Sequence, residues 1–300
     1  MFQGSMVALV TPMRDDETID DAAIDALVDW HLASGTDAIV AVGTTGESAT
    51  LDVGEHLAVI ARVIERVARR IPVIAGTGAN ATREAIVLTR EAAALGADAA
   101  LLVTPYYNKP TQEGLYRHYR AVADAVDVPQ ILYNVPGRTA VDLLSETVGR
   151  LCNHPNIVGV KDATGQLPRL DEMRAVIAET LGSVDGFALI SGDDATATAY
   201  QMAGGHGVIS VTANVVPAEM HRLSLAARTG DRGVADELEA RLSALHRDLF
   251  VEANPIPVKW ALARMGRIEP TLRLPLTPLS SQYHARVEKA LMRAGIELTA

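Results

Sequence analysis

Short apolar runs alternate with longer amphipathic segments along the first two thirds of the chain. The apolar runs are rich in Val, Ile, Leu and Ala, and each ends in small or polar residues, as buried parallel strands do. Strands are expected at residues 6–10, 38–42, 72–75, 99–103, 130–133, 157–161, 187–190 and 207–211. Eight strands with intervening helices predict an α/β fold, a closed parallel (β/α)8 TIM barrel.

The amphipathic segments between these strands predict the surrounding helices. They are expected at 20–34, 53–70, up to 95, 112–125 and up to 151. A doubly wound open sheet is the competing architecture, but it usually carries a glycine fingerprint after the first strand, and Thr11-Pro12-Met13 has none. From Pro217 the pattern changes to helices alone, at 217–227, 231–250, 255–265 and 281–294. We therefore expect a catalytic barrel over residues 1–216 and a C-terminal helical extension, 217–300, packed on it.

Composition narrows the classes of partner. The 300 residues are 48% hydrophobic and 21% charged, with a net charge of -10 and a pI near 5.3. Nucleic acids and anionic membranes require clustered basic surface, so small-molecule ligands are expected instead. Cys152 is the single cysteine, which excludes an intrachain disulfide and favours a reducing compartment. Residues 1–12 lack the pattern of a signal peptide, so we expect a cytoplasmic protein.

Lys161 is the first candidate for chemistry. It ends an apolar strand and precedes a polar turn closed by Gly165, whereas the other lysines, Lys109, Lys259 and Lys289, do not end apolar strands. Burial in a barrel disfavours the ammonium form, and the neutral amine can attack a ketone to form an imine. A lysine at a strand end is nevertheless more often a solvated charge.

Other polar residues at strand ends are expected around the same mouth of the barrel. Thr44, Thr45 and Tyr107 follow the second and fourth strands, and Tyr133 ends the strand before that of Lys161. Imine chemistry needs a proton carrier, and Tyr133 is suitably placed, while Arg138 can clamp a substrate carboxylate. No His, Cys or Glu cluster has the spacing of metal ligands, so a metal-dependent aldolase is less attractive.

Several of these features also have purely structural interpretations. Thr-Thr-Gly is often only a tight turn, and neighbouring tyrosines are usually packing residues. His56, His118 and His206 are expected at the surface or in the core, and Asp193-Asp194 is expected to cap the following helix. The convergence of several polar turns on one rim favours chemistry.

These motifs together resemble the dihydrodipicolinate synthase family of pyruvate-dependent class I aldolases and lyases. The similarity runs in family order across nearly the whole chain. The matching segments are 43–48 (Gly-Thr-Thr-Gly-Glu-Ser), 76–80 (Gly-Thr-Gly-Ala-Asn), 103–107 (Val-Thr-Pro-Tyr-Tyr), 132–139 (Leu-Tyr-Asn-Val-Pro-Gly-Arg-Thr), 158–165 (Val-Gly-Val-Lys-Asp-Ala-Thr-Gly), 191–194 (Ser-Gly-Asp-Asp), 205–210 (Gly-His-Gly-Val-Ile-Ser) and 254–259 (Asn-Pro-Ile-Pro-Val-Lys).

The resemblance implies condensation of pyruvate with L-aspartate 4-semialdehyde to 4-hydroxy-tetrahydrodipicolinate. This is the first committed step of diaminopimelate and L-lysine biosynthesis. The implied roles are a Schiff base on Lys161, proton transfer by Tyr133, and a relay through Thr44 and Tyr107, the last serving a neighbouring subunit. The remaining substrate contacts implied are Thr45 and the main chain of Ile209 for pyruvate, Arg138 for the aldehyde's carboxylate, and Gly192 as a further substrate-binding residue. A homotetramer built as a dimer of dimers is also implied, without a cofactor.

An inhibitory L-lysine site at the tight dimer interface is implied as well. Its matching positions are Ser48, Ala49, His56, Asn80, Glu84 and Tyr106. The chain departs from the pattern at Val53, where lysine-sensitive relatives have histidine, and at Asp162, where many members have Glu. It also has about six extra residues between Leu170 and Phe187, expected in a longer outer helix or loop.

Two other functions compete with this hypothesis. N-acetylneuraminate lyase and 2-keto-3-deoxy sugar acid aldolases would use Lys161 and Tyr133 equally well. Arg138 and the Tyr106-Tyr107 pair favour the synthase, because a short acidic aldehyde needs a carboxylate clamp. A non-catalytic lysine-binding barrel is the more remote alternative, and such a protein need not keep Lys161, Tyr133 and Thr44 together.

Overall fold

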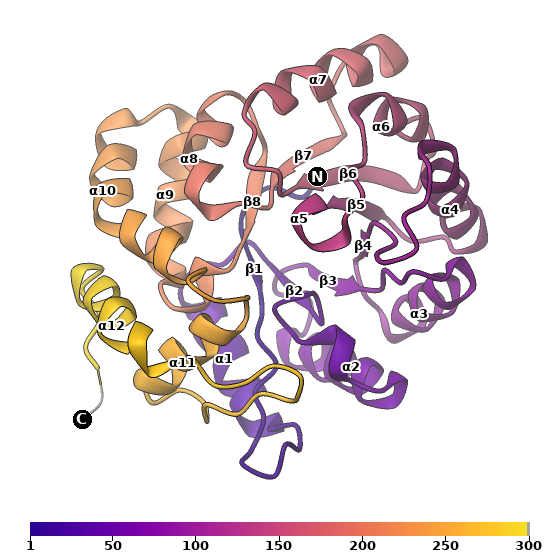
Figure 1. Cartoon of the computed structure of the whole chain (residues 1–300). Coiled ribbons are helices and arrows are strands. Elements are labelled where there is room, and N and C mark those ends of the chain that lie inside the picture. The colour runs from indigo at the N-terminus through magenta and orange to yellow at the C-terminus, as the bar shows by residue number, and fades with distance from the viewer. Residues whose placement is uncertain (299–300) are drawn as a thin grey trace.

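The computed structural model describes residues 1–298, and its strands form one closed sheet. Eight parallel strands follow in sequence order around a barrel, and β1 closes the ring by pairing with β8 (Figure 1). The strands are β1 (Gly4–Ala8), β2 (Ala38–Ala41), β3 (Val73–Gly76), β4 (Ala99–Val103), β5 (Gln130–Asn134), β6 (Ile157–Asp162), β7 (Ala188–Ser191) and β8 (Gly207–Ser210). The predicted (β/α)8 TIM barrel is confirmed, and the open-sheet alternative is excluded.

Helices surround the barrel, and capping residues in the sequence mark where some of them begin or end. The Asp20 carboxylate accepts a hydrogen bond from the Ala23 amide before the first helix, and Gly96 ends the third with φ of 95°. The helices are α1 (Asp21–Ala33), α2 (Val53–Val67), α3 (Thr82–Leu95), α4 (Gln112–Ala125), α5 (Pro136–Thr139), α6 (Ser145–Leu151), α7 (Pro168–Leu181), α8 (Asp194–Met202), α9 (Pro217–Thr229), α10 (Arg232–Asp248), α11 (Ile256–Arg264) and α12 (His284–Arg293). No helix of the described residues is both long and apolar enough to cross a membrane.

Side chains fill the inside of the barrel. One inner cluster of buried residues contains Met6, Val40, Ile74, Leu101, Ile131, Tyr133, Ile190 and Ile209, among others. Larger apolar clusters lie between the strands and the outer helices. The barrel interior is therefore a packed core, and only its mouth is free to bind ligands.

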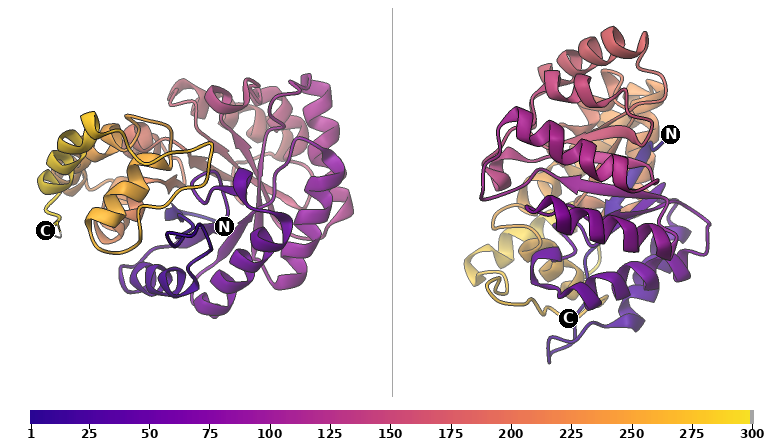
Figure 2. Two further views of the ribbon diagram at one scale, coloured as in Figure 1. Left: turned by 60° about the horizontal axis from the view of Figure 1, so that its bottom comes forward. Right: turned by 90° about the vertical axis from the view of Figure 1, so that its right-hand side faces the viewer.

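The C-terminal helices continue the ring before they extend beyond it. Helix α9 packs against β1 and α8, so it takes the place of the eighth barrel helix. Helices α10, α11 and α12 then lie along one side of the barrel (Figures 1 and 2). The domain boundary after residue 216 stays a prediction, and the packing of α9 favours a boundary after that helix.

Several strand ends differ by one or two residues from the sequence prediction, and two of the local differences shape the turns at the mouth of the barrel. Strand β2 ends one residue early because Val42 has φ of 54°, which is rare for a β-branched residue and turns the chain sharply. Residues Pro136–Thr139, expected as part of a turn, form the short helix α5 instead. Pro at the first helical position suits a helix start, but one turn containing glycine gives little periodic signal.

Candidate active site

Lys161 lies near the end of β6, on a strand that is almost entirely buried. Its neighbour across the sheet is Tyr133 of β5, with which it is in register. Parallel pairing brings the carboxyl ends of both strands to the same rim, as the sequence predicted. The Lys161 Nζ lies 4.2 Å from the centre of the Tyr133 ring.

Burial sets the protonation of both residues. Lys161 is only 5% exposed, and desolvation lowers the pKa of its amine to about 7, although the nearby Asp194 charge acts in the opposite direction. Burial also raises the pKa of Tyr133, while Arg138 and a hydrogen bond with the Thr44 side chain act to lower it. At neutral pH the site can therefore hold a neutral amine beside a protonated phenol.

Small residues leave room for the Lys161 side chain. Gly192 follows β7, and a Cβ atom added there would lie 2.8 Å from Lys161 Cε and 2.7 Å from the Ala163 side chain. Such contacts are too short to tolerate without displacement of the lysine. The next residue of β6 is Asp162, at the position where many family members have Glu. Its carboxylate accepts a hydrogen bond of 2.9 Å from Asn134, so the shorter Asp side chain still has a hydrogen-bond partner.

The turn after β2 places two threonines at the mouth. Val42 reverses the chain direction, and Glu47 again has a positive φ of 56°. Between them, Thr44 reaches the Tyr133 hydroxyl. Thr45 is buried and accepts a hydrogen bond of 2.9 Å from Asn254 Nδ2, a residue of the segment before α11.

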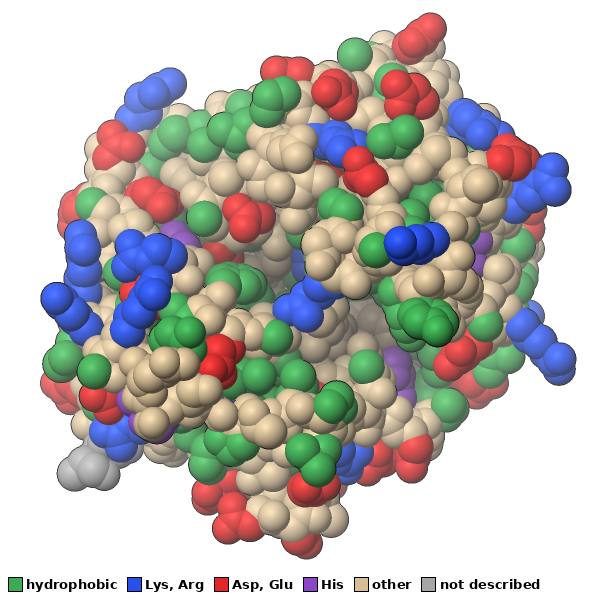
Figure 3. All heavy atoms as spheres, viewed as in Figure 1, with side chains coloured by type: hydrophobic (Ala, Val, Ile, Leu, Met, Phe, Trp, Pro, Cys, Tyr) green, Lys and Arg blue, Asp and Glu red, His purple; other side chains and the backbone are tan. Residues whose placement is uncertain are grey.

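These residues surround a cavity of about 210 Å³. Its lining includes Thr44, Thr45, Tyr133, Arg138, Lys161, Gly192 and Asn254. The space-filling view shows a hollow near the middle of this face (Figure 3). Ile209 is the exception among the expected pyruvate contacts, because it is buried in β8 and does not line the cavity.

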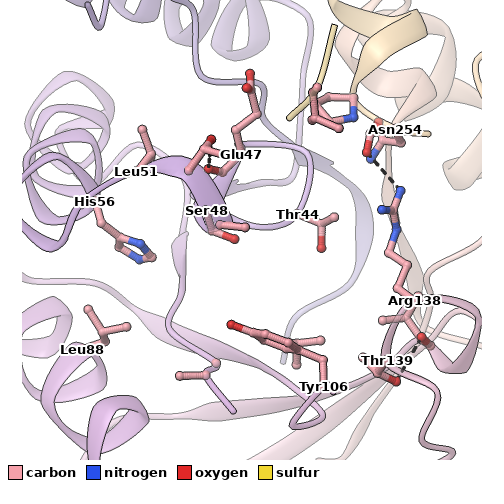
Figure 4. A pocket seen from close by; sticks show the side chains of 18 of the residues that line it. Thr44, Glu47, Ser48, Leu51, His56, Leu88, Tyr106, Arg138, Thr139 and Asn254 are labelled. Atoms are coloured by element: carbon pink, nitrogen blue, oxygen red, sulfur yellow. Dashed lines mark hydrogen bonds between the residues drawn. The ribbon is translucent and has the colours of Figure 1, made fainter. Parts of the chain in front are cut away.

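Arg138 lies at the edge of the cavity on helix α5. It is exposed, and its Nη2 donates a hydrogen bond of 3.0 Å to the Asn254 main-chain oxygen (Figure 4). The short helix thus presents the guanidinium over the mouth, where it can bind a carboxylate with two parallel hydrogen bonds.

Tyr107 does not line the active-site cavity of its own chain. Its side chain is 90% exposed, and its φ of 72° projects it from the loop after β4. Asn108 Nδ2 holds the same loop by a hydrogen bond of 2.8 Å to the Asn80 main-chain oxygen. The expected position of Tyr107 in a neighbouring subunit's site stays a prediction.

A second cavity of about 360 Å³ adjoins the first. It is lined by Thr44 and Arg138 and also by Ser48, Ala49, His56, Glu84 and Tyr106, five of the six positions expected for the lysine site (Figure 4). Asn80 does not line it. Val53 does, and its side chain is 52% exposed.

Many polar residues line this second cavity, and His56, Tyr106 and Glu84 are among those with an ionisable group. The His56 ring nitrogen Nε2 lies 2.8 Å from the Gly76 oxygen, and burial lowers the pKa of the ring. The pKa of Tyr106 is raised, first by burial and then by the Glu84 charge. Glu84 itself is exposed and carries the negative charge that an ammonium group would bind.

The remaining sequence candidates have structural partners. Asp193 caps α8, as predicted, and its carboxylate accepts from the Thr196 amide. Asp194 instead lies buried and accepts hydrogen bonds from the Val211 and Thr212 amides at the end of β8. Within residues 1–298, no group of three or more His, Cys, Asp and Glu side chains is arranged to hold a metal ion.

Three residues near the site were not among the sequence candidates. Asn254 contacts Thr45 and Arg138, and Lys259 of α11 forms a fully buried ion pair of 2.5 Å with Glu47. One signal could have identified Lys259, because it interrupts the apolar run 256–262, and a charge in such a run indicates a buried partner. Asn254 gives no such signal.

A buried amine with a pKa near neutrality, packed against a tyrosine at the mouth of a TIM barrel, is an arrangement suited to Schiff-base chemistry. The model of the Dihydrodipicolinate synthetase family matches residues 1–294. The chain therefore belongs to this family.

Relatives and solved structures agree over the full length. The chain is 64% identical to a 4-hydroxy-tetrahydrodipicolinate synthase of Thioalkalivibrio sulfidiphilus, covering 100% of both chains. It is 62% identical to the Methylococcus capsulatus enzyme of the same name, over 99% of this chain and 100% of the relative.

Among solved structures, a chloride-inhibited dihydrodipicolinate synthase from Acinetobacter baumannii, complexed with pyruvate, is similar with a TM-score of 0.94. It is 55% identical, covering 99% of this chain and 100% of that chain. The Cyanidioschyzon merolae enzyme with lysine bound has a TM-score of 0.93 and 39% identity, covering 99% of each chain.

Proposed function

We propose that the protein condenses pyruvate with L-aspartate 4-semialdehyde to give 4-hydroxy-tetrahydrodipicolinate, the first committed step towards diaminopimelate and L-lysine. The observation that carries this proposal is Lys161, a buried amine with a pKa of about 7, in contact with the Tyr133 ring. Its neutral form attacks the ketone of pyruvate, and loss of water gives the imine.

Tyr133 supplies and accepts the protons of these steps. The phenol is protonated at neutral pH, and its position beside Lys161 suits it to protonate the departing hydroxyl and then to collect the proton that pyruvate loses from its methyl carbon. Thr44 continues the proton path, and Tyr107 of a neighbouring subunit completes it. The enamine carbon then attacks the aldehyde.

Residues at the rim hold the two substrates. Thr45 and Gly192, which line the cavity, bind pyruvate, and Arg138 binds the carboxylate of the aldehyde substrate. The second role is supported by the exposed guanidinium at the cavity edge. It distinguishes this enzyme from the sugar-acid lyases, which receive a longer polyhydroxy aldehyde.

L-Lysine is proposed as an inhibitor bound in the second cavity. Glu84 would pair with an ammonium group, and Ser48, His56 and Tyr106 would bind the polar ends of the amino acid. This cavity shares Thr44 and Arg138 with the active-site lining, so a ligand there can affect both. The relative with lysine bound supports the assignment.

A homotetramer, a dimer of dimers, is the proposed assembly, and a reducing cytoplasm is its proposed compartment. The highly exposed Tyr107 supports association, because an aromatic ring held outward by a positive φ suits a partner surface. Sedimentation velocity tests the assembly: a monomer at assay concentrations would contradict it.

Turnover tests the reaction. Pyruvate and L-aspartate 4-semialdehyde are supplied, with the next reductase of the pathway as coupling enzyme and with or without L-lysine. Robust turnover is expected, reduced by lysine. If this aldehyde is not consumed while N-acetylmannosamine or a sugar-acid aldehyde is, the substrate assignment is wrong although the imine chemistry stands.

A further inference from the structure

Asn254 joins the C-terminal helices to the mouth of the barrel. It lies between α10 and α11, is only 5% exposed, and lines both cavities. Its hydrogen bond to Thr45 joins positions 209 residues apart in the sequence. The residue therefore contacts the substrate-binding turn directly although it belongs to a distant segment.

In the structure the Asn254 side chain faces Thr45 with its amide nitrogen, and among the described residues its buried Oδ1 has no hydrogen-bond partner. Nδ2 of Asn254 donates to Thr45 Oγ1 over 2.9 Å. A hydroxyl that accepts one hydrogen bond keeps its own hydrogen to donate elsewhere. Among the described residues, the Thr45 hydroxyl has no acceptor for that hydrogen, and Thr45 is one of the residues that line the cavity beside Lys161. A carboxylate bound in this cavity would provide the acceptor.

The main chain of Asn254 has a separate partner. Its oxygen accepts the 3.0 Å hydrogen bond from Arg138 Nη2 (Figure 4). Replacement of the side chain would leave this second contact in place. One residue thus contacts the pyruvate side through its amide group and the aldehyde side through its backbone.

Buried contacts nearby fix the relative position of the two segments. Lys259 Nζ lies 2.5 Å from Glu47 and 3.0 Å from the Thr11 oxygen, and the pair has no exposed side-chain surface. Because Glu47 follows Thr45 in the same turn, α11 is attached to that turn independently of Asn254. Loss of the Asn254 amide should therefore change one hydrogen bond without releasing the turn.

We propose that Asn254 is a positioning residue for pyruvate: its amide orients the Thr45 hydroxyl to donate to the pyruvate carboxylate. The proposal rests on the proposed function, in which pyruvate forms an imine with Lys161. The two parts of Asn254 have separate roles: its side chain orients Thr45 for pyruvate, and its main-chain oxygen accepts the hydrogen bond from Arg138.

The test compares two half-saturation constants in the full-length protein. Pyruvate is titrated in borohydride trapping, without any aldehyde, and both substrates are titrated in turnover. Asn254→Ala should raise the pyruvate constant roughly tenfold, as expected for a hydrogen bond to a charged group, and change the KM for the aldehyde by less than about twofold. Asn254→Asp should be worse, because a carboxylate accepts from Thr45 and repels the substrate anion.

Two further variants distinguish a specific effect on the Thr45 hydroxyl from a general loosening of the segment around residue 254. Glu252→Gln, two residues away, alters a partly exposed carboxylate that accepts from the Ser280 amide, and it should behave as wild type. Thr45→Val should reproduce the pyruvate effect without altering residue 254. In the Thr45→Val background, Asn254→Ala should add little, because both changes remove one interaction.

The contrary results are distinct. Unchanged pyruvate saturation in Asn254→Ala, equal losses for both substrates, additive losses in the double variant, or wild-type behaviour of Asn254→Asp would each overturn the proposal. Failure of the proposed function would give a different result, because the wild-type protein itself would not turn over L-aspartate 4-semialdehyde. Pyruvate trapping in wild type and Asn254→Ala would still test whether Asn254 positions pyruvate.

Discussion

Lys161 and Tyr133 face each other across adjacent strands, with the lysine Nζ 4.2 Å from the centre of the tyrosine ring. The aromatic ring removes water from one side of the amine, which contributes to the burial that lowers its pKa to about 7. The same contact places the phenol beside the atom where the imine forms. Activation of the nucleophile and supply of protons therefore depend on one packing arrangement.

The first prediction concerns pH. Because burial lowers the pKa of Lys161 to about 7, the neutral amine predominates above that pH, and its fraction falls about tenfold per unit below it. Reductive trapping of pyruvate with cyanoborohydride should therefore accelerate up to roughly pH 7 to 8 and then level off. A rate that keeps rising towards pH 10 would indicate an ordinary solvated lysine.

The barrel could be predicted from sequence because each buried strand carries its own signal. A short Val, Ile and Ala run followed by a polar turn is readable locally, as at Ala99–Val103, whose predicted bounds match the structure. The shared location of Lys161 and Tyr133 at the rim could be predicted in the same way, because the carboxyl ends of all parallel strands lie on one face of the barrel.

Contacts between distant segments could not be predicted in this way. Asn254 precedes a proline in an irregular segment, and nothing nearby in the sequence indicates its hydrogen bond to Thr45. The positive φ of Val42 contradicts the preference of a β-branched residue, and the Val42 backbone lies so close to Gly46 and Gly76 that a Cβ atom at either glycine would clash with it. Helix α5 was missed because a single turn has no measurable period.

The second prediction concerns the buried ion pair. Lys259→Met would leave the Glu47 carboxylate, which is fully buried, without its partner. We expect the free energy of unfolding to fall by about 3 to 5 kcal/mol, measured by chemical denaturation. Lys289→Met, on the exposed surface of α12, is the matched control and should have little effect. Equal stability of the two variants would show that the ion pair between Lys259 and Glu47 does not stabilise the fold.

The third prediction tests the space around the nucleophile. In Gly192→Ala, the new Cβ would lie 2.8 Å from Lys161 Cε, so the lysine must move. We expect imine trapping to slow at least roughly tenfold, because small displacements of a reacting group are costly. Gly233→Ala, where the nearest neighbour would be an Asp231 oxygen at 3.7 Å, is the control. Unimpaired trapping in Gly192→Ala would mean that the lysine is less constrained than the packing indicates.

The fourth prediction concerns the lysine site. Glu84→Ala should raise the lysine concentration for half-maximal inhibition by about fivefold or more, because an ammonium group loses its partner. Turnover without lysine should be unchanged, as it should be in the control Glu91→Ala, an exposed residue of the same helix. The same inhibition in Glu84→Ala as in wild type would remove Glu84 from the site.

A gain of function would complement that loss. Val53 lines the second cavity and offers no hydrogen bond, so Val53→His would add a polar group near the proposed ligand. Inhibition by L-lysine should become stronger in this variant. A weaker response would indicate that the ligand binds elsewhere in the cavity.

The most direct test of the central claim is borohydride reduction in the presence of pyruvate, followed by peptide mass analysis of wild type and Lys161→Ala. The Schiff-base mechanism predicts one pyruvate-derived adduct on the peptide that contains Lys161. It predicts no adduct in Lys161→Ala, whose circular dichroism spectrum should match wild type. An adduct on Lys259, or no adduct on the folded wild-type protein, would contradict the mechanism.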